Sequence, residues 1–287
     1  MKKSLEIKIF PYFMVFPAVF IFALFLFYPA VNGLIVALHR WDGLGPMHFI
    51  GLDNFTRMFG DRHFVRALTR TLFFTAAAVP AVYVSALMLA LVLTRKIKGL
   101  SFFRAVFFWP TMVSAIIVGL TWRFILGESF GLVNFFVTSA GFEPIRWMTN
   151  PNMAMFTVIM VTTWSLSGYY MVMLIAGLKS IDETYYEAAE IDGAGFWKQF
   201  FYITLPLLRP MSLLVLVLST VQVVRTFPLI VGLTQGGPAG ATRFMVQMIQ
   251  ETGFGMQQMG YASAMAVVLF IILALMTAIQ FRLNRGN

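Results

Sequence analysis

Charged residues divide the chain into long uncharged segments, and the lengths of these segments predict its secondary structure. A bilayer core about 30 Å thick is crossed by about 20 residues of α-helix. Each uncharged run is long enough for one such helix, and the fifth run becomes long enough once its single charge, Arg225, is included. The pattern therefore predicts an all-α, polytopic membrane protein with six spans, at about 10–38, 70–94, 103–125, 153–178, 209–233 and 259–281.

The composition supports a membrane protein, with 59% hydrophobic and 11% charged residues, against about 25% charged residues in an average soluble domain. The first uncharged run follows Met-Lys-Lys, but it is longer than the h-region of a signal peptide, so we expect a retained helix. The chain has no cysteine, which excludes thiolate ligands. Its three histidines (His39, His48 and His63) fall in one loop, where a metal cluster is possible but disfavoured.

The net charge of +9 could indicate nucleic-acid binding or membrane topology. In a chain with six spans, lysines and arginines are better interpreted as orientation signals. With the N-terminus inside, the inner segments hold twelve of them and the outer loops hold seven, five of which lie in the first outer loop. This distribution predicts that both termini are cytoplasmic and that nucleic acid is not a partner.

The segments between the spans are short, so the chain has little room for a soluble domain. Residues 39–69 form an outer loop in which GLDNFTRMFGDRHFVRAL (51–68) alternates apolar and charged residues at roughly helical spacing, and we expect short helices there at the membrane surface. We find no internal repeat and no linker. The sequence therefore predicts a single transmembrane domain over residues 1–287, with a core at 67–282.

Several absences narrow the function. The chain contains neither a phosphate-binding G-x-x-x-x-G-K-[ST] loop nor an H-E-x-x-H zinc motif, so we expect no hydrolytic activity of its own. Ion-coupled carriers usually keep a carboxylate within the membrane because the coupling ion requires it. None of the six predicted spans contains Asp or Glu. Energy for uphill transport would have to enter from elsewhere.

The inner loop at 179–208 is the most acidic part of the chain, with five of its twelve carboxylates between Asp182 and Asp192. Ser180 and Glu183 fit a capping box, which predicts a helix that starts at Ser180 and stops near Gly193. A second short helix is expected from Phe196 to Ile203, ending before Pro206. Small side chains flanked by glutamates suit a docking surface, although a solvated loop helix would show the same periodicity.

The segment Glu187 to Pro206, EAAEIDGAGFWKQFFYITLP, resembles the EAA loop of the permease subunits of binding-protein-dependent ABC importers. The likeness rests on E-A-A, then G after three residues, then I-x-L-P after nine more. FIGLDNF, FFWPTMVSAIIVGLTWRFIL, LTQGGPAGAT and MGYASAMAVVLF resemble the carbohydrate branch of that family, which carries maltose, other oligosaccharides or glycerol phosphate. The likeness extends over nearly the whole chain.

This resemblance implies the type I ABC importer permease fold, with a first span peripheral to a five-helix core, in a bacterial or archaeal inner membrane. It implies a heterodimer with a second homologous permease, two ATPase subunits that bind ATP and magnesium, and an extracytoplasmic solute-binding protein. The EAA helix would seat in a cleft of the ATPase. The residues that the resemblance assigns to this coupling contact are Glu187, Ala188, Ala189, Asp192 and Gly193.

The family places its solute contacts on the helices either side of the EAA loop. Tyr169 lies ten residues before Lys179, about 15 Å along the fourth span and near mid-depth. In the fifth span, Ser219, Gln222 and Thr226 recur at helical spacing. We expect these four side chains to form a polar face for solute, although Ser219 and Thr226 could simply bond to helix carbonyls and Tyr169 could fill space.

Arg225 is the only charge within the fifth span. It lies about 28 Å along the helix from Pro206, in the outer half of the membrane. Its guanidinium could extend to the outer interface, or it could face a cavity and donate to sugar hydroxyls or a phosphate. We favour the cavity.

Two other functions remain compatible with the sequence. The same architecture could import another polar solute, such as a polyamine or a phosphonate. A membrane scaffold or signalling protein could instead use the charged loop to recruit a partner without transport.

Overall fold

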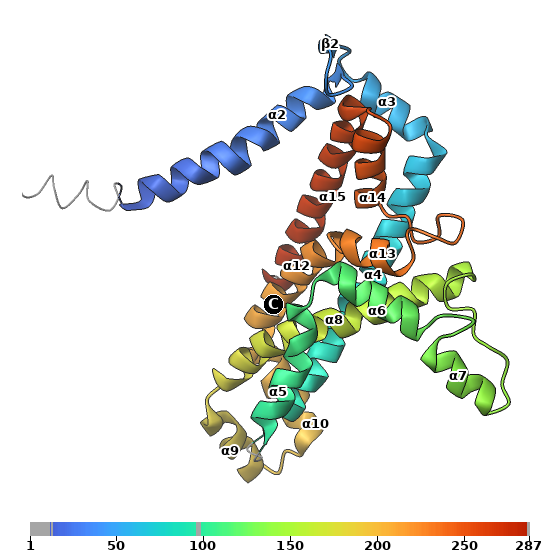
Figure 1. Ribbon diagram of the computed structural model, residues 1–287. Helices are drawn as coiled ribbons and strands as arrows, with labels where there is room; N and C mark the ends of the chain where they lie inside the picture. The colour runs from blue at the N-terminus through green and yellow to red at the C-terminus, as the bar shows by residue number, and fades with distance from the viewer. Residues whose placement is uncertain (1–11, 13, 96–98, 286–287) are drawn as a thin grey trace, which may run out of the picture. The chain divides into compact units, whose positions relative to one another are not determined.

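The computed structural model describes residues 12, 14–95 and 99–285, and almost all of its regular structure is helical (Figure 1). Four helices are long and apolar enough to cross a membrane: Met14–Ala37, α4 (Arg62–Leu93), α8 (Pro151–Lys179) and the helix that begins at Met259. Two further pairs of helices also pass this test if each bent pair is one span, which gives up to six. The predicted all-α, six-span architecture is confirmed.

The third predicted span is bent, so the expectation of one continuous helix at 103–125 was wrong. The chain forms α5 (Leu100–Phe108), a 3₁₀ turn η2 (Trp109–Met112) and α6 (Ala115–Ile125), with an angle of 101° at the break. Pro110 occupies the start of the 3₁₀ turn, where its missing N–H is tolerated. Extended backbone at Val113 then separates the two halves.

The fifth predicted span is also interrupted. The helix α12 (Arg209–Val224) ends at Arg225, and α13 (Phe227–Leu233) starts after Thr226, so 209–233 is not one helix. Pro228, in the first turn of α13, has no N–H to donate to the Val224 carbonyl four residues earlier, so α12 cannot continue unbroken through this point. Sequence reasoning did not give this proline enough weight.

Before α12, the chain continues through α10 (Phe196–Gln199), a π-helical turn η3 (Phe200–Thr204) and α11 (Leu205–Leu207). The predicted stop before Pro206 was wrong, because Pro206 falls in the first turn of α11, a position at which proline is tolerated. The direction changes instead at Leu208, where Phe196–Leu207 and Arg209–Val224 meet at 68°.

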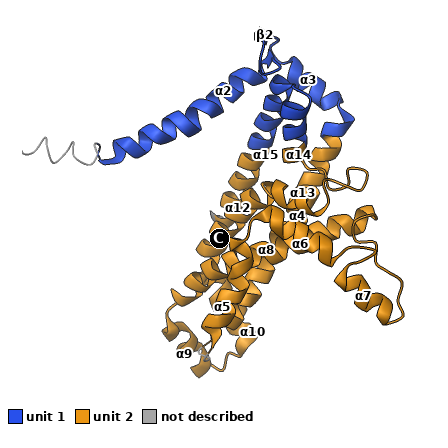
Figure 2. Cartoon of the chain, in the orientation of Figure 1, with its two compact units in different colours: residues 1–64, 248–271 blue, residues 65–247, 272–287 orange. Residues whose placement is uncertain are grey.

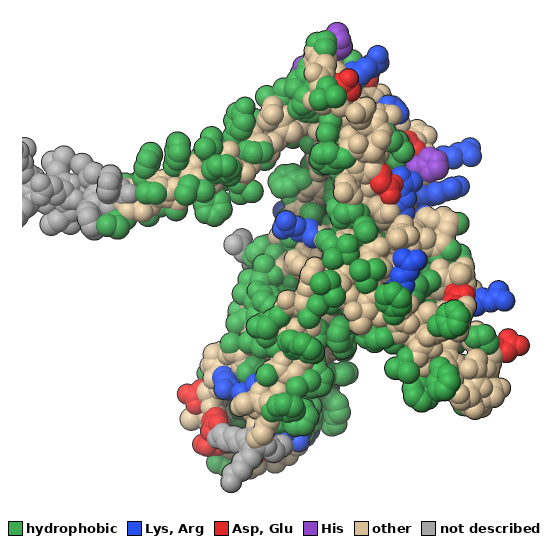
Figure 3. All heavy atoms as spheres, in the orientation of Figure 1, with side chains coloured by type: hydrophobic (Ala, Val, Ile, Leu, Met, Phe, Trp, Pro, Cys, Tyr) green, Lys and Arg blue, Asp and Glu red, His purple; other side chains and the backbone are tan. Residues whose placement is uncertain are grey.

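The chain separates into two compact units (Figure 2). The first comprises residues 1–64 and 248–271. Its described part contains the helix Met14–Ala37, which includes the π-helical turn η1 (Ala23–Phe27) and α2 (Tyr28–Ala37). The most apolar part of that helix is not buried, and hydrophobic side chains cover it in Figure 3. This surface is suited to lipid or to a second subunit.

A small β-hairpin follows that helix, which the sequence did not predict. The strands β1 (His39–Arg40) and β2 (His48–Phe49) pair antiparallel, with His39 opposite Phe49. The helix α3 (Asp53–Gly60) comes next and confirms the expected short helix in this loop. The unit is completed by the π-helical turn η4 (Glu251–Gly255) and the first half of α15 (Met259–Arg285).

The second unit comprises residues 65–247 and 272–287 and contains two hydrophobic clusters. One cluster joins α4, α6, α8 and α13 around Phe74, Val158 and Leu229. The other joins α4, α8 and α12 around Val82, Leu174 and Val215. The unit also contains α7 (Leu132–Ser139) and α14 (Met245–Gln250), except for its last three residues.

Two glycines allow α6 and α13 to approach at backbone distance. A Cβ added at Gly119 would lie 2.4 Å from the Leu229 carbonyl oxygen, and one at Gly232 would lie 2.4 Å from the Ile116 carbonyl oxygen. Small residues at a helix crossing are typical of packing within membranes. The broken halves of the third and fifth spans are therefore held against each other.

Candidate functional site

The predicted coupling loop contains the short helix α9 (Glu183–Ile191). Its N-cap is Asp182, whose carboxylate accepts a hydrogen bond from the Thr184 amide at 3.0 Å. This bond and one from the Thr184 side chain hold the pKa of Asp182 below its ordinary value. The predicted capping box was wrong, because Ser180 instead caps the end of α8 and its hydroxyl donates to the Gly177 carbonyl.

The predicted end of α9 at Gly193 is confirmed. Gly193 has φ of +75°, and its amide donates to Glu190 while the amide of Ala194 donates to Ala189. This pair of bonds is the Schellman pattern, which favours glycine at the left-handed position. A Cβ at Gly193 would meet no atom within 4 Å, so conformation rather than space requires glycine here.

Side-chain hydrogen bonds attach α9 and the turn after it to the segment that follows. The hydroxyls of Tyr186 and Thr204 lie 2.9 Å apart, and the Gln199 amide donates to the Ala194 carbonyl at 3.0 Å. Sequence reasoning missed Tyr186, because nothing in the local pattern distinguishes it from Tyr185. These bonds fix the position of the helix relative to α10 and η3.

The rest of α9 is available to a partner, since none of its residues is buried. Glu187, Ala188, Asp192 and Gly193 are exposed, and Ala189 is half-buried. Ile191, which the sequence did not single out, is 88% exposed. A large apolar side chain beside alanines and carboxylates is suited to docking into another protein surface.

The five predicted solute contacts divide into two groups. Tyr169 on α8 and Gln222 and Arg225 on or after α12 are exposed. Ser219 is fully buried and its hydroxyl donates to the Leu216 carbonyl, while the largely buried Thr226 donates to the Gln222 carbonyl. For these two hydroxyls the structure favours the helix-bonding alternative.

Arg225 lies at the break between α12 and α13, where it is the C-cap of α12. Within the described residues its guanidinium has no hydrogen-bond or ion-pair partner. An arginine with free donors at a helix break can bind a polar ligand or water. Arg225 at this break therefore has donors available for a ligand or water.

The three histidines of the first loop do not form a metal site. His39 is hydrogen-bonded through Nδ1 to the Ile35 carbonyl at 2.7 Å, and its ring packs edge-on against Phe49. Across residues 12, 14–95 and 99–285, no three His, Asp or Glu side chains are grouped to hold an ion.

Helices of spanning length, two bent helix pairs and a capped, exposed loop helix together describe a polytopic membrane protein. Residues 55–287 match the family described as "Binding-protein-dependent transport system inner membrane component". The chain belongs to this family. It is therefore a multi-pass permease of the inner membrane, a translocation component of an ABC transport system rather than an enzyme.

Curated relatives match almost the whole chain. A probable ABC transporter permease, YurN of Bacillus subtilis, is 33% identical over 280 residues, covering 96% of each chain. The trehalose/maltose permease MalF of Thermococcus litoralis is 31% identical, covering 96% of this chain and 93% of the relative. The sn-glycerol-3-phosphate permease UgpA of Brucella abortus is 33% identical, covering 96% and 94%.

A solved structure confirms the fold. A chain from a bacterial ABC transporter that imports the acidic polysaccharide alginate aligns with a TM-score of 0.87 at 23% identity, covering 99% of this chain and 97% of that one. A second structure of an alginate transporter, in complex with its pentasaccharide-bound periplasmic protein, gives 0.86 at 22% identity. The type I importer permease fold is thus shown.

Proposed function

We propose that this permease forms half of the translocation pathway of an ATP-driven carbohydrate importer. Relatives named for trehalose and maltose, for sn-glycerol-3-phosphate and for diacetylchitobiose support a saccharide or saccharide phosphate as solute. The diacetylchitobiose permease NgcF of Streptomyces coelicolor is 35% identical over 280 residues. The second half of the pathway would be a homologous, non-identical permease.

The coupling role is assigned to α9, and its exposure is the observation that carries the proposal. Ile191 and Ala188 present an apolar surface between the carboxylates of Glu187 and Asp192. We place this surface in a cleft of one of two ATPase subunits, which bind ATP and magnesium. Because α9 is hydrogen-bonded to η3, a movement of the ATPase would be passed toward α12.

Solute contact is assigned to the exposed members of the predicted polar face, Tyr169 and Gln222, together with Arg225. An aromatic ring, an amide and a guanidinium are the groups that stack on and donate to a sugar. Ser219 and Thr226 would support this face from within α12 through their bonds to helix carbonyls. Loaded binding protein would deliver the sugar to it from the outer side.

Reconstitution tests the proposal. The chain is co-purified with its ATPase, partner permease and binding protein, and the binding protein is first screened against saccharides by thermal shift. We expect ATP-dependent uptake of the stabilising sugar into proteoliposomes, with ATPase activity stimulated by loaded binding protein. Purification without any ATPase, or uptake that needs no ATP, would refute the importer.

The proposed orientation, with both termini in the cytoplasm, has a separate test. The chain has no cysteine, so single cysteines can be introduced at the exposed positions Glu190 and Phe142. A membrane-impermeant thiol reagent should label Glu190→Cys only from the cytoplasmic side and Phe142→Cys only from outside. Labelling of both from one side would overturn the topology.

A further inference from the structure

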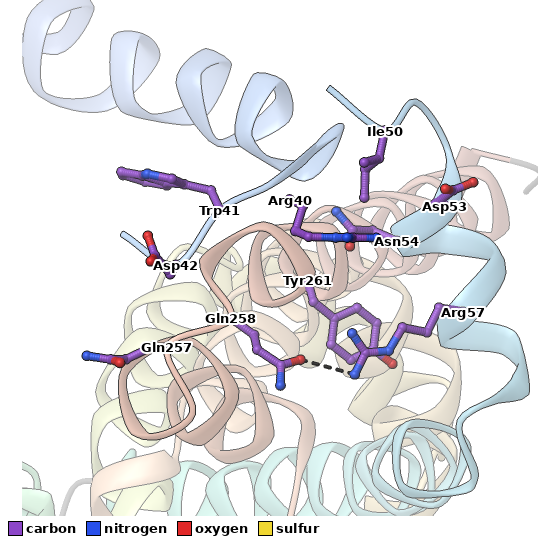
Figure 4. A pocket seen from close by; sticks show the side chains of 10 residues that line it. All are labelled: Arg40, Trp41, Asp42, Ile50, Asp53, Asn54, Arg57, Gln257, Gln258 and Tyr261. Carbon is purple, nitrogen blue, oxygen red and sulfur yellow. Dashed lines mark hydrogen bonds between the residues drawn. The ribbon is translucent and has the colours of Figure 1, made fainter. Parts of the chain in front are cut away.

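A pocket of about 370 Å³ lies within the first unit and is lined by none of the residues discussed so far as coupling or solute contacts (Figure 4). Three segments line it: the hairpin with the residue that follows it, α3, and the start of α15 with the turn before it. Its volume is within the range of small-ligand sites, roughly 300–1,000 Å³. The lining residues are Arg40, Trp41, Asp42, Ile50, Asp53, Asn54, Arg57, Gln257, Gln258 and Tyr261.

Two buried polar side chains make the pocket a fixed structure. Asn54 is 5% exposed and donates to the carbonyls of Ala37 and His39, which joins α3 to the start of the hairpin. Tyr261 is 4% exposed and donates through its hydroxyl to Asp61 at 2.9 Å. Burial tends to raise the pKa of Asp61, but this bond and the His63 amide outweigh it and hold the pKa below its ordinary value.

The two arginines of the pocket are arranged differently. The guanidinium of Arg57 lies 4.3 Å from the centre of the Tyr261 ring and donates to the Gln258 side chain at 3.1 Å. Arg40 has no side-chain partner among the described residues. One cation is therefore held in place by the protein and the other is free to bind.

The two aspartates balance the two arginines in formal charge, but among the described residues they form no ion pair with them. The Asp42 carboxylate accepts hydrogen bonds from the amides of Leu44 and Gly45 at 2.9 and 2.8 Å, and these bonds hold it within the hairpin loop. Asp53 lies in the first turn of α3, where a negative charge is favoured by the helix dipole. In Figure 4 both carboxylates lie at the edges of the pocket, whereas Arg40 and Arg57 extend toward its middle.

We propose that this pocket receives an acidic side chain of the extracytoplasmic binding protein, with Arg40 as the residue that pairs with its carboxylate. The proposal rests on the proposed function and orientation, in which the loop after the first span faces outward. Arginine forms paired hydrogen bonds with a carboxylate. Arg, Tyr and Trp around a preformed hollow are also the composition of interface positions that dominate affinity.

The test uses the full complex in nanodiscs, with ATPase activity measured as loaded binding protein is titrated. Arg40→Gln should raise the half-saturating concentration of binding protein about tenfold at low salt, with the maximal rate unchanged. High salt should reduce this difference, because it screens the charge pair. Arg62→Gln, an exposed arginine just outside the pocket, is the matched control and should behave as wild type.

A charge exchange sharpens the result. Arg40→Glu should weaken binding further, and replacing the contacting acidic residue of the binding protein by lysine should restore it. If the Arg40→Gln complex needs the same half-saturating concentration of binding protein as wild type, the pocket assignment is overturned while the importer proposal stands. Failure of the wild-type complex to respond to binding protein at all would overturn both proposals.

Free solute is the alternative occupant. Calorimetric titration of the complex with free sugar, without binding protein, should give the same result for wild type and Arg40→Gln. Loss of free-sugar binding in the variant, with unchanged response to binding protein, would assign the pocket to solute and overturn the proposal.

Discussion

Two loops of the second unit are built in opposite ways. The loop around α9, which we propose lies on the cytoplasmic side and call the inner loop, has its own caps, and Ile191 on its surface is 88% exposed. The loop at 234–244, which the same orientation places outside and which we call the outer loop, instead has side-chain hydrogen bonds within itself. Thr234 and Thr242 share a hydrogen bond of 2.7 Å, and Thr242 also bonds to the Gly237 carbonyl.

The outer loop is also tied to the core of its unit. The Arg70 guanidinium on α4 donates to the Gly240 carbonyl, and the Thr71 hydroxyl accepts the Met245 amide at 2.9 Å. A loop whose bonds are closed on itself keeps one shape, whereas a capped helix with an unburied apolar surface needs a partner. The contrast supports the proposal that the inner loop, and not the outer loop, is the one that docks on a partner.

The largest effect is expected where the inner loop depends on one backbone angle. Gly193→Glu places a side chain at φ of +75°, which costs of order 1–3 kcal/mol, and adds a charge beside the docking surface. Uptake and stimulated ATPase activity should fall about thirtyfold, with normal membrane insertion. Gly195→Ala, in the same turn at φ of −73°, is the control and should be near wild type. Full uptake by inserted Gly193→Glu would count against the docking role.

The next effect concerns Arg225, at the break between α12 and α13. Arg225→Gln and Arg225→Lys should each raise the half-saturating solute concentration about tenfold, because neither reproduces the planar fork of the guanidinium. ATPase assembly should be unchanged. Normal uptake by the lysine variant at every solute concentration would support extension to the outer interface and remove Arg225 from the site.

The rigidity of the outer loop has its own test. Arg70→Gln removes the donor to the Gly240 carbonyl, and a spin label at the exposed Ala239 should then report greater mobility, with uptake reduced about fivefold. Arg66→Gln, one turn earlier on α4 and exposed, is the matched control. Equal mobility in both variants would show that the internal bonds of the loop are sufficient.

A smaller effect is expected at the attachment of α9. Tyr186→Phe and Thr204→Val each remove one side of the 2.9 Å hydrogen bond, and each should lower stimulated ATPase activity about threefold. If the bond transmits movement, the double variant should be no worse than either single one. Additive losses would show that the two hydroxyls act separately.

The smallest effect concerns the N-cap of α9. Because its folded-state pKa is lowered below the ordinary 3.8, Asp182 stabilises the helix above that range and loses this contribution only as pH falls through the lowered pKa. Coupling should therefore not change through Asp182 between pH 6 and 8, roughly its charged range. Asp182→Asn, which keeps the cap, should resemble wild type, whereas Asp182→Ala should lower coupling.

The sequence predicted the features that depend on local pattern. Uncharged runs gave the spans, and Gly193 gave the end of α9. The sequence did not predict the bends, because Pro110 and Pro228 break helices only in particular backbone settings. Nor could it show that Ser219 is fully buried, since its spacing is the same for a cavity face and a packed one.

Contacts between distant segments were also beyond the sequence. The pocket at Arg40 depends on Arg57 lying over the Tyr261 ring, and no local signal brings α3 to the start of α15. Likewise, Tyr186 and Thr204 meet only because the turn at Gly193 reverses the chain. Such sites require the three-dimensional arrangement.

The central claim is that the exposed surface of α9 contacts the ATPase. In this cysteine-free chain, Ile191→Cys is treated with a short bifunctional thiol crosslinker in the assembled, ATP-hydrolysing complex, with the exposed Phe142→Cys as control. The account predicts a crosslinked product of permease and ATPase from position 191 and none from position 142. Absence of that product at Ile191 in an active complex whose ATPase carries accessible cysteines along its cleft would contradict it.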